Sequence, residues 1–396
     1  MIDVTKHKFL KFLLSGAMYF SEGIGFALLT VILIFYLNDQ GFPYPLTTLI
    51  VGVTNIPWMI KFFWGGIVDH FQKLGRKPFI VFGSLISAVG FLVVAFISPD
   101  FNLVAFTLAL ILADFGLALF DTAFDAWAIE ISNEDERGKI NGAIQAGLAG
   151  GLIFGASVFG FFSKSYGYPL AFMTGSLILV ISILAFHIFV AENIRKKQSQ
   201  KLTKILVKEF KKRSTQALSL FAPVSTVGNG LLILAIPLYF SDRFNLDVAQ
   251  TGLIYVLFPL CRLIGSLVGG YITDLKEKKK VLTVYICSLS VACVLLLAAD
   301  NWQMLAVFYG LFAFLHGGYG TAILAIFMDI TNPKVGASQF SILTSFMNFG
   351  ESGIGAITGT LLAIVGFSGV FLYAAWAYGP ALLVIHFVKL RNLPGK

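Results

Sequence analysis

The stretch ENIRKKQSQKLTKILVKEFKKRST (192–215) is the only long polar segment of this 396-residue sequence. It lies near the middle of the chain, with six long apolar runs before it and six after it. It therefore divides the chain into 1–190, a basic linker at 191–215, and 216–396. Within it, Leu202, Ile205, Leu206 and Phe210 recur at helical spacing. This pattern predicts either an amphipathic helix at the membrane surface or a solvated basic tether.

Each apolar run is long enough to cross a lipid bilayer, which takes about 20 residues in an α-helix. The first run is too long for a signal peptide and has no small-residue cleavage site, so we expect it to be retained. The sequence predicts an all-α membrane protein of twelve transmembrane helices in two pseudo-symmetric six-helix bundles. The expected spans are 9–37, 44–68, 79–98, 102–130, 140–163, 168–190, 216–240, 247–273, 281–299, 302–328, 338–365 and 367–388.

The composition excludes an ordinary soluble fold. Charged residues make up 13% of the chain and hydrophobic residues 57%, whereas soluble domains carry about 25% charged residues. The three cysteines, Cys261, Cys287 and Cys293, lie in apolar runs and lack metal-ligand spacing. We therefore expect no metal and no cofactor, and a monomer whose main partner is the lipid bilayer.

The basic residues predict the orientation in the membrane. If the N-terminus is cytoplasmic and the spans alternate, 25 of the 29 lysines and arginines fall in cytoplasmic segments. Only Lys164 and Arg243 fall outside, while Lys61 and Arg262 lie within spans. Because cytoplasmic loops are enriched in Lys and Arg, both termini are expected in the cytoplasm, across a plasma (inner) membrane. The same distribution explains the net charge of +8 without a nucleic-acid partner.

The two halves of the sequence resemble each other. The second span ends in Gly65-Gly66-Ile67-Val68-Asp69 and the eighth in Gly270-Tyr271-Ile272-Thr273-Asp274; the two aspartates are 205 residues apart and each precedes a basic loop. The fourth and tenth spans end in Glu130-Ile131-Ser132-Asn133 and Asp329-Ile330-Thr331-Asn332, at an offset of 199. Duplicated halves predict a substrate site between them and a rocking motion about it.

One of these loops resembles a family signature. Gly65-x-x-x-Asp69 followed by Gly75-Arg76-Lys77 is similar to the loop between spans two and three of the major facilitator superfamily, although Phe71–Leu74 lengthens it and His70 replaces a basic residue. The resemblance implies the major facilitator fold. It also implies that Asp69, Arg76, Glu130 and Arg137 form a charge network that steadies the outward-open state, with Gly65, Gly75, Gly270, Asp274 and Asp329 completing the repeated motif. The alternative is that Asp69 only caps a helix.

Four further patches resemble one branch, the AmpG-like muropeptide permeases and acetyl-CoA transporters. They are Lys61-Phe62-Phe63-Trp64, Asp121-x-x-x-Asp125-Ala126-Trp127, Glu136-Arg137-Gly138, and Thr331-Asn332-Pro333 with 337–345. Many muropeptide permeases are longer and carry extra spans, whereas shorter members of the branch include siderophore importers. The resemblance therefore leaves the substrate open.

Ionisable residues inside spans cost at least about 2.5–3.5 kcal/mol to insert, so each is a functional candidate. The candidates for substrate or proton binding are Glu22, Lys61, Asp114, Asp121, Asp125, Asn229, Arg262, His316 and Glu351. Acids outnumber bases, which favours coupling to a cation. We expect Glu22 and Asp114 to be the leading proton carriers, because both lie near mid-membrane without an obvious base at the same depth.

Asp114, Asp121 and Asp125 share one helix face, since they are spaced i, i+7 and i+11. Lys61 and Asp121 lie at a similar depth, about 12–15 Å from the inner ends of their helices. Lys61 is therefore an expected partner of Asp121, and it could also pair with Asp125. Such pairs could carry protons, or they could only lock helices together.

The second half offers fewer charges. Arg262 and Glu351 could lock the two halves together or anchor a substrate, because the guanidinium fork suits a carboxylate or phosphate. His316, beside Gly317, Gly318 and Gly320, could mark a broken helix lining a cavity or be a packing residue. Asn229 and Asn55 could be cavity contacts or interhelical bonds.

The sequence contains no H-E-x-x-H, G-x-S-x-G or Walker motif, so an enzyme and an ATP-driven pump are not expected. We predict a secondary active transporter that moves a small polar or amphiphilic solute by alternating access, with proton-coupled import of a muropeptide, siderophore or similar compound. The alternatives are a proton-coupled exporter of drugs or lipids on the same fold, and a channel or membrane-embedded enzyme.

Overall fold

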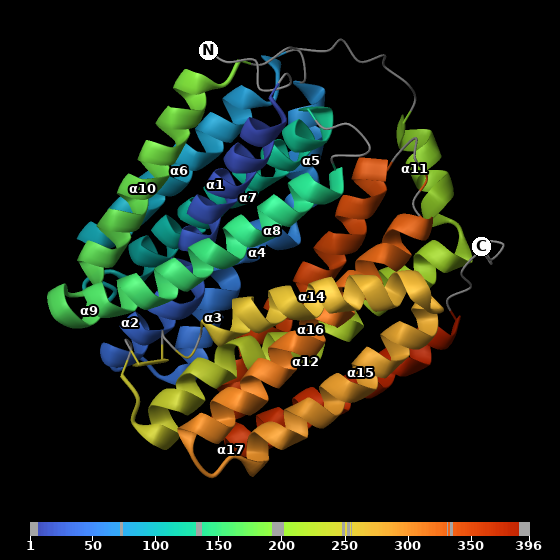
Figure 1. The fold of residues 1–396 in the computed structure, drawn as a ribbon. Helices are drawn as coiled ribbons and strands as arrows, with labels where there is room; N and C mark the ends of the chain where they lie inside the picture. Colours follow the sequence, from blue (N-terminus) through green and yellow to red (C-terminus); the bar gives the residue numbers. More distant parts are fainter. Residues whose placement is uncertain are drawn as a thin grey trace.

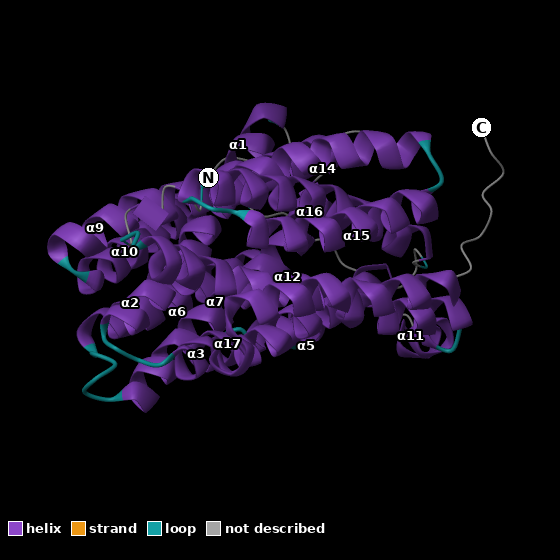
Figure 2. Cartoon of the chain, turned by 90° about the horizontal axis from the view of Figure 1, so that it is seen from below, coloured by secondary structure: helices purple, strands orange, loops and turns teal. Residues whose placement is uncertain are grey.

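A computed structural model of the chain describes residues 7–71, 74–131, 137–191, 202–247, 250–251, 254, 256–330, 332 and 336–387. These residues fold almost entirely as helices (Figure 2). Figure 1 shows two bundles, one from each half of the sequence. Helices are required here because lipid offers no partner to the backbone, so each segment must satisfy its own N–H and C=O groups.

The first half contains six spans. The first is α1 (Lys8–Ala27), a π-helical turn at Leu28–Ile32 and α2 (Leu33–Asp39), and the second is broken into α3 (Tyr44–Thr54), α4 (Ile56–Met59) and α5 (Lys61–His70). The third and fourth are α6 (Lys77–Phe96) and α7 (Leu103–Ile131). The fifth is α8 (Arg137–Phe154), a π-helical turn at Gly155–Phe159 and α9 (Gly160–Tyr166), and the sixth is α10 (Tyr168–Phe189).

The second half follows the linker helix α11 (Leu202–Phe210). Its helices are α12 (Arg213–Phe244), α14 (Leu257–Leu275), α15 (Lys278–Leu295) with a 3-10 turn at Leu296–Ala298, α16 (Trp302–Ile330) and α17 (Gly336–Phe387). Within the described residues, nine helices are long and apolar enough to cross a membrane. The number falls short of twelve because the second span is broken, α14 is short, and α17 counts once although it holds two spans. The twelve-span architecture is confirmed.

Gly366 separates the last two spans within α17. Its backbone angles (φ 66°, ψ −178°) are non-helical and belong to a region that only glycine occupies readily. Both ends of α17 lie at the same end of the molecule: Gln339 accepts a hydrogen bond from the backbone N–H of Asn332 (3.0 Å), and the His386 carbonyl accepts one from Lys279 (3.0 Å). The chain therefore reverses at Gly366, between the predicted runs 338–365 and 367–388.

The same lysine contact occurs in both halves. Lys77, at the start of α6, donates to the carbonyls of His187 (2.8 Å) and Val190 (2.5 Å) at the end of α10. Lys279, at the start of α15, donates to His386 near the end of α17. Each cation meets unpaired carbonyls at a helix C-terminus, where positive charge is favourable. We call the end of the molecule that carries Lys77, α11 and Lys279 the basic end.

The two halves touch through α3, α4 and α5 against α17, and through α8 against α14. Several polar contacts between them lie at the end away from the basic end, which we call the opposite end. Tyr44 donates to Asp242 (3.3 Å), Lys164 pairs with Asp247 (2.5 Å), and the Gly359 N–H donates to the Thr48 hydroxyl (2.8 Å). The molecule is therefore closed at the opposite end.

The linker helix α11 packs against the second half. Glu209 is buried, accepts a hydrogen bond from Asn332 (2.8 Å) and pairs with Lys212. Burial disfavours its charge, but the hydrogen bonds from Lys212 and Asn332 outweigh that cost and hold the pKa of Glu209 below its usual value. Lys204, Lys208 and Lys211 point outward. The apolar spacing in the linker thus forms a helix, with its lysines exposed at the basic end.

Candidate substrate and proton site

The first half contains a polar cluster built from α1, α5 and α7. Asp121 and Asp125, one turn apart on α7, face Tyr19 of α1 and Lys61 at the start of α5. Tyr19 donates to Asp121 Oδ1 (3.0 Å) and also contacts Asp125 Oδ1. Lys61 Nζ forms an ion pair with Asp121 Oδ2 and lies 3.8 Å from Asp125 Oδ2. The structure thus pairs Lys61 with the aspartate expected from their similar depth.

Glu22 completes this cluster from α1. It lies one turn after Tyr19, is 1% exposed, and is close enough to Asp121, Asp125 and Lys61 to interact with them electrostatically. Among the described residues of this cluster, Glu22, Asp121 and Asp125 are the acids and Lys61 is the one base. Because uncompensated buried charge is costly, the cluster should hold protons.

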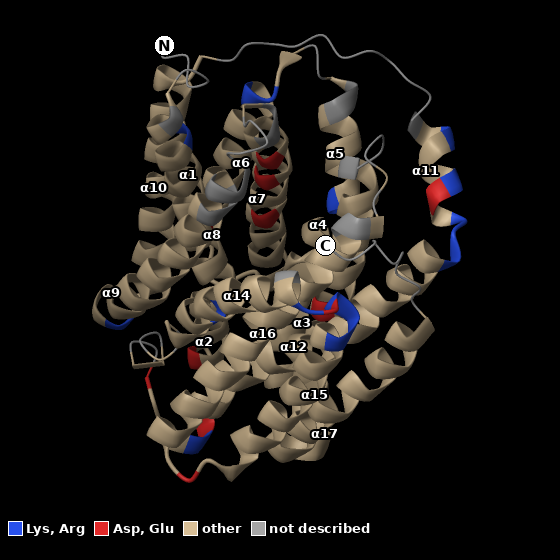
Figure 3. Ribbon diagram, turned by 45° about the vertical axis from the view of Figure 1, so that its right-hand side comes forward, with Lys and Arg blue, Asp and Glu red and all other residues tan. Residues whose placement is uncertain are grey.

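Figure 3 shows the acidic residues of α7 in red along one side of that helix. Asp114 lies on the same face about two turns before Asp121, outside the cluster. It is fully buried, and its Oδ1 accepts a hydrogen bond from the indole of Trp58 in α4 (2.9 Å). Trp58 also stands beside Lys61, with the ammonium 5.2 Å from the ring centre. One tryptophan therefore links Asp114 to the cluster.

The break in the second span positions Trp58. Asn55 ends α3, and its side chain donates to the Val51 carbonyl of its own helix (2.8 Å). Pro57 follows in the first turn of α4, where its missing N–H is tolerated. The Pro57 carbonyl accepts a hydrogen bond from Trp64 (3.1 Å). The short α4 thus turns Trp58 toward α7.

The second half carries a smaller group of polar residues. Arg262 of α14 and Glu351 of α17 are close enough to interact electrostatically, and Asn229 of α12 lies beside Glu351. Arg262 is exposed, whereas Asn229 is buried. Among the residues described in this group, one acid faces one base, so the charges balance, in contrast to the first half.

His316 lies within the packing of the second half. Its ring stacks with Phe312 (centroids 6.1 Å apart) and contacts Phe258 and Tyr319. Helix α16 runs unbroken through this position, and Gly317 packs directly against the Arg262 backbone. Of the two alternatives for His316, the structure shows the packing residue and not the broken helix, with Gly317 and Gly318 in close helix contact.

The repeated loop motif is described only in part. Gly75 adopts φ 83°, which favours glycine, and Arg76 is buried. A side chain at Gly65 would meet only Thr122, at 3.9 Å. Gly270 lies within α14. The side chains of Asp69, Glu130, Arg137, Asp274 and Asp329 lie outside those that the structure describes, so the proposed charge network stays a prediction.

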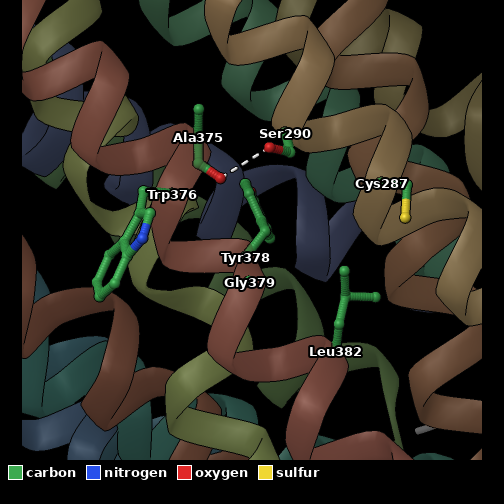
Figure 4. Close-up of a pocket in the computed structure, with 7 residues that line it drawn as sticks. All are labelled: Cys287, Ser290, Ala375, Trp376, Tyr378, Gly379 and Leu382. Carbon is green, nitrogen blue, oxygen red and sulfur yellow. Dashed lines mark hydrogen bonds between the residues drawn. The ribbon is translucent and has the colours of Figure 1, made fainter.

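A groove of about 330 Å³ lies between α15 and the final span, and none of these charged residues lines it. Figure 4 shows its wall, where Ser290 donates to the Ala375 carbonyl (2.8 Å) beside Trp376 and Cys287. Trp376 is 73% exposed and lies on the outer face of the helix. The groove belongs to the apolar surface of the bundle, away from the polar clusters.

Two residues of the first-half cluster were not predicted from the sequence. Tyr19 lies three positions before Glu22, so helical spacing alone places it on the same face. Trp58 carried no such signal, since its orientation depends on the break at Asn55. Both belong to types that combine an apolar body with one hydrogen-bond donor, which suits them to buried acids.

Comparison with known proteins gives consistent matches. The family model described as Major Facilitator Superfamily matches residues 15–227 and 218–396. The putative transporter AmpG 4 of Rickettsia conorii is 22% identical over 389 residues, covering 90% of this chain and 91% of that protein. The anhydromuropeptide permease of Escherichia coli K12 is 21% identical, covering 83% of this chain and 70% of that protein.

Two solved structures share the fold. A bacterial homologue of the human lysosomal transporter Spinster, in an inward-facing and unoccupied conformation, superposes with a TM-score of 0.73 at 14% identity, covering 96% of this chain and 94% of that one. The Escherichia coli fucose:proton symporter gives a TM-score of 0.66 at 14% identity, covering 96% and 99%. At this identity the likeness concerns the fold.

Proposed function

Because this chain belongs to the Major Facilitator Superfamily, in its AmpG-like branch, we propose that it imports a muropeptide-like solute by proton-coupled alternating access. The observation that carries the proposal is the first-half cluster, in which Glu22, Asp121 and Asp125 face Lys61 as the one base among the residues described there. A buried site with more acids than bases can bind and release protons as its access to water changes.

The contacts between the halves support alternating access. They close the opposite end, while Asp125, with a side chain 47% exposed, and Arg262 remain accessible. We propose that the basic end faces the cytoplasm, that both termini lie there, and that the protein resides in the inner membrane as a monomer. In this conformation the site is open toward the cytoplasm, as expected for an importer that has released its solute.

Arg262 is the proposed anchor for the solute. It is the exposed member of the second-half group, and its planar guanidinium suits a carboxylate. Muropeptides carry carboxylates on their peptide portion. A solute held by Arg262 would compete with Glu351 for the same cation, which links binding to the balance of charge in the second half.

The test is uptake of radiolabelled anhydromuropeptide into proteoliposomes. We expect accumulation driven by a proton gradient and abolished by a protonophore. Glu22→Gln and Asp114→Asn, the predicted carriers, should lose gradient-driven accumulation while keeping exchange at equal concentrations. Uptake that does not depend on pH and is driven by a sodium gradient would refute proton coupling. A siderophore or nucleotide thioester transported in its place would change the substrate class only.

A further inference from the structure

We infer that Tyr19 relays protons between water-exposed Asp125 and the buried Asp121–Glu22 pair. The inference rests on the proposed proton coupling and deepens it by naming the route. In the conformation described here, the route would carry the proton from Glu22 out to the basic end. No tyrosine was among the residues predicted for this site.

The hydroxyl of Tyr19 touches two carboxyl groups at once. It contacts Asp121 Oδ1 at 3.0 Å and Asp125 Oδ1 at hydrogen-bond range. A phenol has one proton to donate, so it can donate to only one of the two carboxylates. The second contact is favourable when the other carboxyl is protonated and donates to the phenol oxygen. The three groups then form a continuous chain of hydrogen bonds.

The ring of Tyr19 is held in place for this role. It packs edge-on against Phe124 (centroids 5.6 Å apart) and against Phe120 (6.3 Å), both on α7. Phe120, Asp121, Phe124 and Asp125 are neighbours on that helix, so the aromatic contacts fix the hydroxyl between the two acids. Tyr19 itself is only 4% exposed.

The exposure of the acids sets the direction of the route. The side chain of Asp125 is 47% exposed and can exchange protons with water. The side chain of Asp121 is 8% exposed, and its second oxygen is paired with Lys61. Glu22 is 1% exposed and lies close enough to Asp121 to interact with it electrostatically. The hydroxyl of Tyr19 therefore connects the buried Asp121–Glu22 pair to Asp125, which is accessible to water.

The transfer balances without any other reactant. Protonated Asp121 gives its proton to the Tyr19 oxygen, while the Tyr19 hydroxyl proton passes to Asp125. Tyr19 ends as a neutral phenol, and one proton has moved from Asp121 to Asp125. Asp121 then receives the proton from Glu22, and Asp125 releases its own to water. The reverse sequence loads Glu22.

The test follows the protonation of Glu22 in the full-length protein, without a solute. After a rapid pH change, time-resolved infrared spectroscopy records the carboxyl C=O band, assigned to Glu22 by its loss in Glu22→Gln. Tyr19→Phe keeps the ring and removes the hydroxyl. We expect protonation to slow about tenfold or more, as for loss of a positioned proton donor and acceptor. Wild-type kinetics in Tyr19→Phe would overturn the relay.

Tyr168→Phe is the matched control. Tyr168 is buried in the same half and donates to Asp39 at the opposite end (2.5 Å), so its variant loses an equivalent tyrosine–aspartate bond outside the cluster. It should protonate Glu22 at the wild-type rate; equal slowing in both variants would overturn the relay by showing a general effect of lost stability.

Asp125→Asn provides a second route if Tyr19→Phe does not yield folded protein. This variant removes the exposed end of the chain of hydrogen bonds. The C=O band of Glu22 should then change more slowly after the pH change, to a degree similar to that in Tyr19→Phe. A wild-type rate in this variant would count against the relay. Proton-independent uptake by the wild type would instead refute the proposed function, so the two failures can be told apart.

Discussion

Lys61 is the residue on which the first-half cluster depends most. Among the residues that the structure describes, Lys61 is the base that contacts Asp121 and Asp125, and its side chain is 17% exposed. Its position on α5, directly after the break at Ile60, brings it against α7 and below the ring of Trp58. Without it, three acids would be left together with no cation, and at least one more would have to take up a proton.

We predict that Lys61→Met destabilises the protein by about 2 kcal/mol, the loss expected when a largely buried ion pair loses one partner but the acids can protonate. Adding Asp121→Asn should recover most of that loss, because it removes the carboxylate left unpaired. Thermal unfolding in detergent measures both. Lys164→Met, which breaks an ion pair 55% and 35% exposed, is the control and should cost less than about 1 kcal/mol. An additive loss in the double variant would contradict the pairing.

Contacts at the residue scale were only partly predictable from the sequence. The shared depth of Lys61 and Asp121 could be counted along regular helices, so their pairing was expected. The partner of Asp114 could not be predicted in this way. Trp58 contacts Asp114 because the second span is broken before α4, and hydropathy does not reveal that break. At His316 the neighbouring glycines left a broken helix and a packing role open, and the structure shows the packing role, with Gly317 in direct contact with α14.

At the scale of elements, the closest contact between the halves is that of α3 with α17. The Gly359 N–H donates to Thr48, and a side chain at Gly359 would overlap the Tyr44 carbonyl and the Thr48 hydroxyl. Backbone meets backbone here, so neither helix can yield locally. Closing the opposite end therefore requires glycine at this position.

We predict that Gly359→Ala forces α3 and α17 apart and shifts the protein away from the conformation closed at the opposite end. Spin labels can be placed at the exposed positions Gln40 and Asp300, one in each half. The distance between the two labels, measured by double electron–electron resonance, should be longer in the variant. Gly353→Ala is the control on the same helix, because a side chain there meets nothing within 4 Å. Unchanged distances in Gly359→Ala would show that the contact does not limit closure.

Helix positions followed well from hydropathy, since lipid demands long apolar helices. The reversal between the last two spans fell at Gly366, where the predicted runs met. The breaks in the second span were missed, although local hydrogen bonds mark them, since Asn55 bonds its own helix. Gln250, Thr251 and Ile254 are already helical before α14, and Asp247 and Gln250 bond each other's backbone N–H groups there, close to the expected start at 247.

At the scale of the whole molecule, the two halves repeat each other in structure as well as in sequence. Lys77 with His187 and Lys279 with His386 tie the third span of each half to its sixth. The same contact at equivalent places indicates that each bundle is braced internally. Movement is then expected between the bundles, where contacts are polar and fewer, and not within them.

We predict that both ends of the chain lie in the cytoplasm, on the basis of the 25 basic residues assigned to that side. A fluorescent reporter that matures only in the cytoplasm should be active when fused after Lys396, and an alkaline phosphatase fusion at the same site should be inactive. The reverse result would invert the proposed orientation, so that the basic end would face outward.

The ion pair of Lys164 with Asp247 has a consequence for the medium around the protein. Both side chains are partly exposed, at 55% and 35%, so dissolved ions can screen their attraction. The screening length falls from about 10 Å at 0.1 M ionic strength to about 3 Å at 1 M. Part of the force that holds the opposite end shut therefore depends on the salinity of the compartment it faces. An ordinary salt that is neither solute nor coupling ion would thus tune the resting orientation of the transporter, and it would do so from one side of the membrane alone.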